Sequence, residues 1–220
     1  MPNGTCGNNL SWRLEGTTLT ISGEGEMEDY GCILSKAPWR NHAKLIKEAI
    51  IEEGTTSISK NAFRNCEHLE SIIIADTVIY IGGAAFISCW NLKYITVPYG
   101  VTSINKETFS YCWRLMRATI PSGITSIGER AFSYCLNLRA IIIPNSVTSI
   151  GAEAFQDCKT LPSITIPLSV TTIGEKAFNG CISLRSIYYP ADSGFEKLLN
   201  AGNNAQLIPY SKQSLFHIQL

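Results

Sequence analysis

The side chains with the greatest chemical potential in this chain are its eight cysteines, and six of them recur every 23 residues. Thiols can form disulfides, bind zinc or carry out redox chemistry. The six regularly spaced cysteines are Cys66, Cys89, Cys112, Cys135, Cys158 and Cys181. Which of these chemistries they can perform depends on the fold that positions them.

The cysteines belong to a longer repeat that runs through six copies without an insertion. Isoleucine, phenylalanine and leucine keep the same spacing, beginning at Ile58, Phe63 and Leu69 and ending at Ile173, Phe178 and Leu184. A single unit of this length cannot bury its own apolar face, so neighbouring units must stack. The repeat therefore predicts a solenoid.

Each copy contains patterns of two extended pieces and one tighter piece. The stretch LxxIxIP, as in Leu138 to Pro144, alternates apolar and variable residues, which is typical of a strand with one buried face. Proline then ends the strand because it has no N–H group to donate. The stretch VTSIG at 147–151 predicts a second short strand. The spacing of three between Phe132 and Cys135 predicts a turn of α or 3₁₀ helix.

Stacking decides the expected role of the cysteines. Equivalent residues of successive coils lie above one another with parallel Cβ vectors, which disfavours a disulfide. A column of thiols also fails to converge on one point, as tetrahedral zinc requires. We therefore expect a structural ladder of small buried side chains with weak S–H donors, with a metal or redox role as the less favoured alternative.

The pattern VTSIGxxAFxxCxxLxxIxIPxS, with its cysteine and leucine positions, resembles the BspA-like class of leucine-rich repeats over residues 55–190. Residues 4–30, the APW at 37–39 and the GNNAQLIPY at 202–210 resemble the segments that flank such repeats in bacterial surface proteins. The resemblance implies an α/β fold, namely a right-handed leucine-rich-repeat solenoid of parallel short strands with short helical turns, capped at both ends. It also implies a secreted or surface-attached location and binding to proteins or host matrix, and it brings no shared catalytic residues.

The segments outside the repeat predict three parts of the chain. Residues 1–54 are expected to form an N-terminal capping hairpin, a short helix from about Ala37 or Trp39 to Lys47, and a first strand. Residues 55–190 hold the six repeats. Residues 191–220 are expected to form a C-terminal cap and tail, with a helix over 193–204 that Ser193 would cap and then an edge strand.

Outside the repeat, few residues predict a catalytic or metal site. Cys6 and Cys32 can pair if the protein is exported, but two unpaired cysteines are the favoured interpretation. The three histidines have no metal-ligand spacing, and no cofactor or metal is expected. The acidic cluster at 24–29 is a candidate calcium site, although a solvated loop is the better interpretation because calcium needs six to eight oxygen ligands.

Composition excludes several classes of partner. Lysine plus arginine equals aspartate plus glutamate, at 18 each, so nothing favours nucleic acid or an anionic membrane surface. No stretch approaches the ~20 apolar residues of a membrane-spanning helix. The first residues have neither a basic nor an apolar segment, so no signal peptide is present. We expect that a signal peptide is missing from this chain, and a cytosolic protein is the alternative.

Aromatic residues and arginines occupy variable slots in consecutive copies, where other copies are mostly polar. Aromatic side chains and arginine together are typical of interface anchors. The candidate binding residues are Trp90, Trp113, Tyr111, Tyr134, Tyr94, Arg114 and Arg117. Local packing is the alternative for the aromatic side chains, and a simple cross-strand pair is the alternative for Tyr94 and Arg117.

These observations predict a non-enzymatic binding module that is secreted or at the cell surface. A protein ligand is the expected partner, with a host extracellular protein as one candidate, and no membrane insertion is expected. Two alternatives stay open, namely carbohydrate binding through the stacked tryptophans and a structural spacer within a larger surface protein. An enzyme is disfavoured because the sequence contains no constellation of positioned acids, bases or metal ligands.

Overall fold

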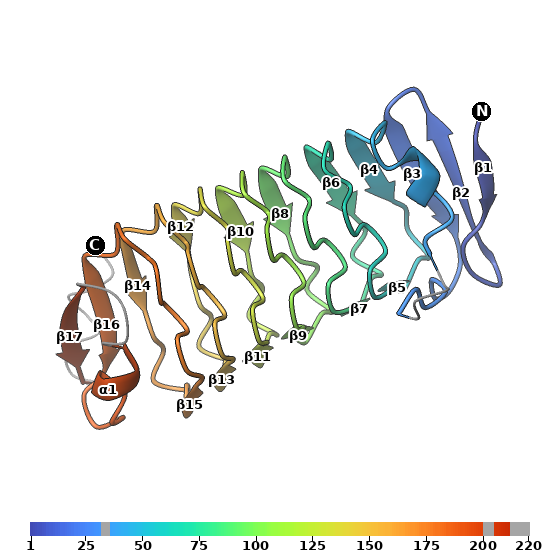
Figure 1. The fold of residues 1–220 in the computed structure, drawn as a ribbon. Coiled ribbons are helices and arrows are strands. Elements are labelled where there is room, and N and C mark those ends of the chain that lie inside the picture. Colours follow the sequence, from blue (N-terminus) through green and yellow to red (C-terminus); the bar gives the residue numbers. More distant parts are fainter. Residues whose placement is uncertain (32–35, 200–204, 212–220) are drawn as a thin grey trace.

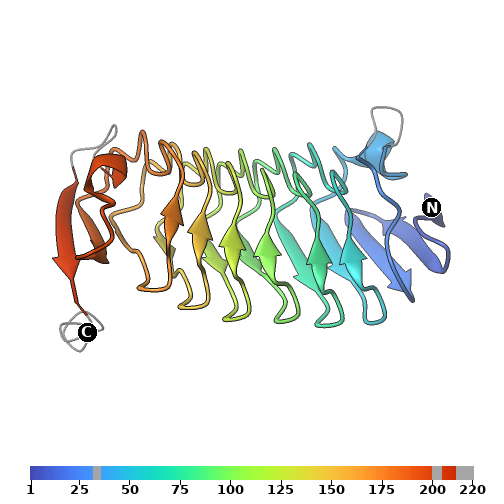
Figure 2. The ribbon, with the colours of Figure 1, turned by 90° about the horizontal axis from the view of Figure 1, so that it is seen from below.

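The computed structural model describes residues 1–31, 36–199 and 205–211, and it shows an elongated parallel β-solenoid of about seven turns (Figure 1). Each coil contributes one strand to a longer column and one to a shorter column, and the two columns run side by side along the axis (Figures 1 and 2). The longer column contains β4 (Glu48–Ile51), β6 (Ser71–Ile74), β8 (Tyr94–Thr96), β10 (Arg117–Thr119), β12 (Ala140–Ile141), β14 (Ser163–Thr165) and β16 (Ser186–Pro190). The shorter column contains β5 (Ser57–Ile58), β7 (Tyr80–Ile81), β9 (Ser103–Ile104), β11 (Ser126–Ile127), β13 (Ser149–Ile150) and β15 (Thr172–Ile173).

The register of the strands follows the period of the sequence. Ser126 pairs with Ser103 on one side and with Ser149 on the other, and Arg117 pairs in the same way with Tyr94 and Ala140. Every one of these pairs joins residues that are 23 apart. Because the register is locked, identical residues of successive coils stack directly, which turns each repeated side chain into a column.

The core lies between the two strand columns and contains a continuous column of phenylalanine rings. Neighbouring rings have centroids 5.2–5.5 Å apart and nearly parallel planes. The indole of Trp39 extends the column at its N-terminal end, with its centroid 5.7 Å from that of Phe63. The stacked rings are Phe63, Phe86, Phe109, Phe132, Phe155 and Phe178.

The expected helical turns are wrong: the segments that carry the phenylalanines and cysteines are runs of tight turns. In these runs Cys66 N–H donates to the carbonyl of Phe63 at 3.0 Å, whereas Phe63 N–H donates across to Ala85 of the next coil at 2.8 Å. Alternate N–H groups therefore leave their own segment, while a helix would send each one to a carbonyl four residues earlier. Spacing of three in the sequence does not distinguish these two bonding patterns.

The N-terminal residues extend the longer sheet. Strands β2 (Leu10–Glu15) and β3 (Thr18–Gly23) form an antiparallel hairpin, β3 pairs in parallel with β4, and β1 (Asn3–Thr5) adds an outer strand beside β2. The helix expected from Ala37 or Trp39 to Lys47 is wrong, since a single 3₁₀ turn, η1 (Arg40–His42), lies between turns. Backbone N–H groups between Arg40 and Ile46 donate to carbonyls three residues earlier, so they are hydrogen-bonded without an α-helix.

At the C-terminal end, a short helix and a final strand follow the last coil. Helix α1 (Glu196–Leu199) begins later than expected, because Leu199 N–H donates to the carbonyl of Phe195 while Ser193 stays outside the helix. The rest of the expected helix, residues 200–204, lies outside the described residues. Strand β17 (Gln206–Tyr210) then pairs in parallel with β16 and ends the sheet.

No helix among the described residues is long and apolar enough to cross a membrane. Within the same ranges no group of three or more histidine, cysteine, aspartate or glutamate side chains is placed to hold a metal ion, including the acidic cluster at 24–29. Cys6 is buried, but its expected alternative partner Cys32 lies outside the described residues.

Candidate binding face

The six repeated cysteines line the core as a column, and five of them make the same hydrogen bond. Each of these S–H groups donates to the carbonyl of a phenylalanine in the preceding coil, with sulfur to oxygen distances of 3.1–3.3 Å. Burial raises the pKa of the Cys66 thiol to about 12 and raises the pKa of Cys89, Cys112, Cys135 and Cys158 in the same direction. A thiol held protonated is a poor nucleophile and a poor metal ligand.

Trp90 and Trp113 form a stacked pair on the surface of the turn segments. Their ring centroids lie 4.6 Å apart and their planes differ by 5°. This distance nearly equals the spacing of neighbouring strands, so the rings stand across the solenoid axis with their edges outward. Register places Glu67 and Leu136 in the same slot of the flanking coils, and Trp113 remains 37% exposed.

Tyr111 and Tyr134 form a second stacked pair beside the tryptophans. Their centroids are 4.7 Å apart with planes 6° from parallel, and Tyr111 is 39% exposed. Only the buried Cys112 separates Tyr111 from Trp113 along the chain, so the two pairs are neighbouring columns. We call Trp90, Trp113, Tyr111 and Tyr134 the aromatic face.

Both tyrosines adopt a backbone conformation that is unfavourable for bulky residues. Tyr111 has φ 60° and Tyr134 has φ 59°, in the left-handed region. The same slot holds Asn65, Asp157 and Gly180 in other coils, which are the residue types that tolerate this region best. The fold imposes this conformation at the same slot in every coil, Ser88 included. It is therefore the bulk and exposure of these two side chains in that slot that make the tyrosines candidates for a selected role.

We expect that replacing Tyr111 and Tyr134 by asparagine leaves the protein folded and almost equally stable. The change relieves left-handed strain of about 1 kcal/mol per residue and removes a ring pair worth about 0.5–1.5 kcal/mol. Urea unfolding of the double variant should therefore give a free energy within about 1 kcal/mol of wild type. A loss several times larger would show that the tyrosines serve packing, which would remove them from the binding face.

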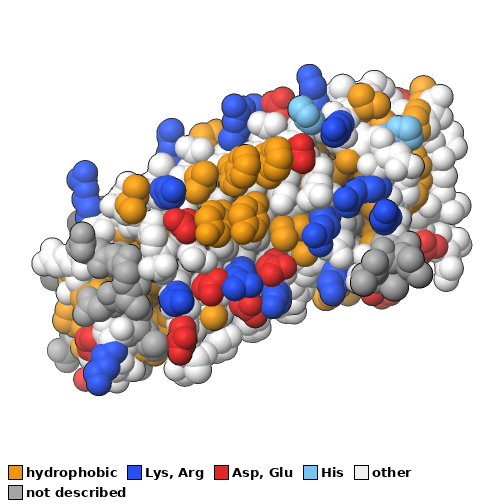
Figure 3. All heavy atoms as spheres, in the orientation of Figure 1, with side chains coloured by type: hydrophobic (Ala, Val, Ile, Leu, Met, Phe, Trp, Pro, Cys, Tyr) orange, Lys and Arg blue, Asp and Glu red, His pale blue; other side chains and the backbone are white. Residues whose placement is uncertain are grey.

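Charged residues border the aromatic face. On one side, Arg130 contacts Glu153 at 2.6 Å, Glu129 at 3.6 Å and Glu107 at 3.9 Å. The negative charge of Asp157 in the next coil raises the pKa of the Tyr134 hydroxyl. Figure 3 shows hydrophobic side chains gathered over the middle coils with acidic and basic side chains around them.

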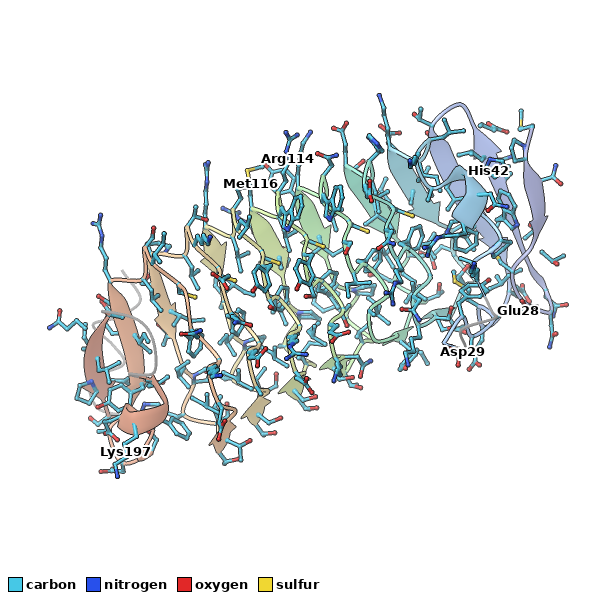
Figure 4. All side chains as sticks on the ribbon, in the orientation of Figure 1. Glu28, Asp29, His42, Arg114, Met116 and Lys197 are labelled. Carbon is cyan, nitrogen blue, oxygen red and sulfur yellow. The ribbon has the colours of Figure 1, made fainter. Side chains whose placement is uncertain are left out.

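The remaining predicted residues lie away from the aromatic face. Tyr94 and Arg117 are the first residues of β8 and β10, where they pair in register and are both exposed on the longer sheet. Arg114 lies at the edge between these regions, where Met116 lies close by (Figure 4). The hydrogen bond from Lys93 lowers the pKa of Glu70, and the charge of Arg114 acts in the same direction. The structure therefore brings together the four aromatic residues and separates them from Tyr94 and Arg117.

Sequence reasoning missed two features of the surface. The first is the ion-pair network that Arg130 forms with Glu107, Glu129 and Glu153. These residues occupy adjacent slots of three consecutive coils, so the sequence contains them as a column of charged residues. The second is a hollow between β12 and β14. The sequence feature that marks this hollow is Pro162. It occupies the slot that Lys93, Arg139 and Arg185 hold in other coils, and unlike them it has no backbone N–H group.

The fold and its repeated core define a leucine-rich-repeat solenoid with an exposed aromatic face. The family description "BspA type Leucine rich repeat region" matches residues 41–162 and 126–200, in six copies. The chain therefore belongs to the BspA-type leucine-rich repeat family. Proteins of this family are typically surface-associated or protein-binding, and typically non-enzymatic.

Solved structures support the same family. A leucine-rich repeat protein from Bacteroides ovatus is 33% identical, with a TM-score of 0.65 over 74% of this chain. The match spans 42% of that protein's length, so this chain corresponds to less than half of it. A T. pallidum leucine-rich repeat protein shares the fold at 21% identity and a TM-score of 0.60, over 94% of this chain and 99% of that one. No curated protein matches the chain.

Proposed function

We propose that this protein is a non-enzymatic, secreted or cell-surface module that binds a protein ligand, in the manner of an adhesin, through the aromatic face. The observation that carries the proposal is the pair of exposed aromatic stacks, of which the tyrosine pair is held in left-handed backbone. Aromatic side chains supply large contact area at low entropic cost and are enriched in interface cores. The charged residues around them supply a polar rim.

The stacking geometry favours protein over carbohydrate as the ligand. A sugar ring that binds tryptophan lies against the face of the indole. Here the inner faces of Trp90 and Trp113 stack on each other, with ring centroids 4.6 Å apart. Glu67 and Leu136 occupy the same slot in the flanking coils, beyond the outer faces. The exposed ring edges suit the side chains and backbone of a protein surface, which makes carbohydrate binding the alternative function.

The test replaces both tryptophans with residue types that their slot already holds in other coils. Trp90→Lys with Trp113→Glu follows the Glu67 and Lys159 found there, and it alternates charge beside Glu67. An array of extracellular matrix proteins and glycans is the probe. We expect at least one matrix protein to bind wild type and to bind the variant about 30-fold or more weakly, since anchors contribute about 2 kcal/mol or more.

A matched control separates the two surfaces of the solenoid. Tyr94→Ser places the residue type of Ser71 and Ser163 in the exposed slot of the longer sheet, and it should leave matrix-protein binding unchanged. Equal binding by wild type and the tryptophan variant would overturn the proposal. Binding to glycans alone would favour the carbohydrate alternative, and no binding to either class would favour the spacer.

A further inference from the structure

Among the described residues, the hydrogen-bond ladder of the longer column is interrupted between β6 and β8 and again between β12 and β14. Strands β8, β10 and β12 form one sheet, and β14, β16 and β17 form another. Among the described residues, no backbone hydrogen bond joins 139–144 to 162–167. The coils on either side are joined at the equivalent place, because Arg139 N–H donates to Met116 at 3.1 Å and Arg185 N–H donates to Pro162 at 2.8 Å.

Pro162 explains where the interruption begins. In the preceding coils the residue in this slot donates its N–H to the coil before it, as Glu70 does to Lys47 and Lys93 does to Glu70. Proline has no N–H group, so the carbonyl of Arg139 receives no such bond. Proline in the middle of a sheet removes a ladder bond and is normally found at edges or bulges.

The interruption coincides with a groove of about 410 Å³ on the longer sheet. Residues 141–143 form one wall, residues 163–165 form the other, and Tyr210 also lines it. A second hollow of about 390 Å³ adjoins it over residues 117–120 and 140–142. Each volume lies within the range of roughly 300–1,000 Å³ that is typical of ligand pockets.

The groove combines apolar side chains with strand backbone that lacks its usual partners. The side chain of Ile142 is 82% exposed at the junction of the two hollows. The facing strands share no backbone hydrogen bond, whereas Lys93 N–H still donates to the carbonyl of Glu70 at 3.2 Å across the interruption between β6 and β8. A ligand that satisfies both features offers main-chain N–H and C=O groups together with apolar side chains, as an extended peptide does.

The charge of the adjoining hollow adds a preference. Arg117 is exposed there, and it makes no ion pair within the described part of the chain. An acidic side chain on the ligand would complement this guanidinium.

We propose that the break between β12 and β14 binds an extended, apolar and acidic peptide segment of a protein ligand. The segment docks along the strand direction and hydrogen-bonds to the backbone that Pro162 leaves unpaired. Ile142 contacts its apolar side chains, and Arg117 contacts an acidic one. This site lies on the longer sheet and is independent of the aromatic face, so the failure of either proposal leaves the other standing.

The test restores the missing N–H group. Pro162→Arg introduces the residue type of Arg139 and Arg185. Met116→Arg adds the same charge in the same slot two coils earlier, where the N–H group already donates to the carbonyl of Lys93, and it retains Pro162. A linear peptide library is selected on wild-type protein, and each selected peptide is then measured on both variants. We expect apolar, acidic peptides that bind Pro162→Arg at least 10-fold more weakly than wild type and bind Met116→Arg within 3-fold of it.

Two further measurements make the result specific. N-methylation of alternate backbone amides in a selected peptide should abolish its binding, because this removes main-chain donors. Hydrogen exchange of the amides in residues 139–144 and 162–167 should slow at least 10-fold in Pro162→Arg as the ladder closes. Peptides that bind wild type and Pro162→Arg equally would overturn the proposal, as would a library that yields no binder. Dimerisation that Pro162→Arg abolishes would also overturn it, by assigning the groove to a second copy of the chain.

Discussion

Raising the pH above about 9 is expected to destabilise this protein steeply, by about 7 kcal/mol per pH unit at the steepest part. The cause is the buried thiol column. Burial raises the pKa of five thiols, with Cys66 at about 12 and the others also raised. In the unfolded chain the same thiols titrate near 8.5. The five are Cys66, Cys89, Cys112, Cys135 and Cys158.

The sign follows from the direction of the shift. The folded state keeps these protons while the unfolded state loses them, so the unfolded state binds fewer protons as the pH rises. A raised pKa therefore contributes stability that is fully present below the unfolded value and is lost above it. Each thiol contributes about 1.4 kcal/mol per pH unit between about 8.5 and its folded pKa. Below pH 8 the thiols should leave stability independent of pH.

Urea unfolding at constant ionic strength, in the presence of a reductant, measures this dependence. The control is Cys112→Ala with Cys135→Ala, which removes two of the five thiols. Tyrosines and lysines titrate equally in both proteins, so the difference between their slopes isolates the cysteines. We expect the slope of the control to be shallower by about 3 kcal/mol per pH unit. Identical slopes would show that the column does not remain protonated in the folded protein.

The second large effect is expected from Phe109→Ala, at about 3–5 kcal/mol of lost unfolding free energy. The Phe109 ring is fully buried, and its centroid lies 5.5 Å from that of Phe86 and 5.3 Å from that of Phe132. Its removal leaves a cavity and also separates the two halves of the ring column. In a solenoid, stability is a sum of unit and nearest-neighbour terms, so a weakened central interface divides the array.

Calorimetry tests both consequences of Phe109→Ala. Wild type should unfold in one cooperative transition, and Phe109→Ala should show two transitions or a markedly broader one. Phe178→Ala is the matched control, since among the described residues Phe178 stacks on one side only, with its centroid 5.4 Å from that of Phe155. It should lower stability less and preserve a single transition. An equal effect at both positions would contradict the role of nearest-neighbour coupling.

The contrast between the phenylalanine and tyrosine columns supports the binding role proposed for the aromatic face. Both columns stack across coils at about the same spacing. The phenylalanines are buried in every coil, whereas Tyr111 and Tyr134 occur in two coils only and hold unfavourable backbone. Burial accounts for the first column by stability alone. Burial does not account for the second column in the same way, because Tyr111 is 39% exposed, which supports the proposed role in binding.

The sequence by itself determined the solenoid, its parallel strands and the columns. An invariant period of 23 residues locks the register, and register places Trp90 over Trp113 and Tyr111 over Tyr134 without any knowledge of the coordinates. It also places the cysteines in one buried column, because equivalent residues of stacked coils share one environment.

Only the tertiary structure decided which carbonyls accept hydrogen bonds from the backbone N–H groups of the turn segments. Alternate N–H groups donate to the next coil, so these segments are tight turns and not the expected helical turns. A spacing of three fits both structures, and the choice depends on carbonyls in the next coil, such as that of Ala85 for Phe63. The tertiary structure also separated Tyr94 and Arg117 from the aromatic face and opened the groove at Pro162. These features depend on hydrogen bonds between coils, which a pattern within one coil does not encode.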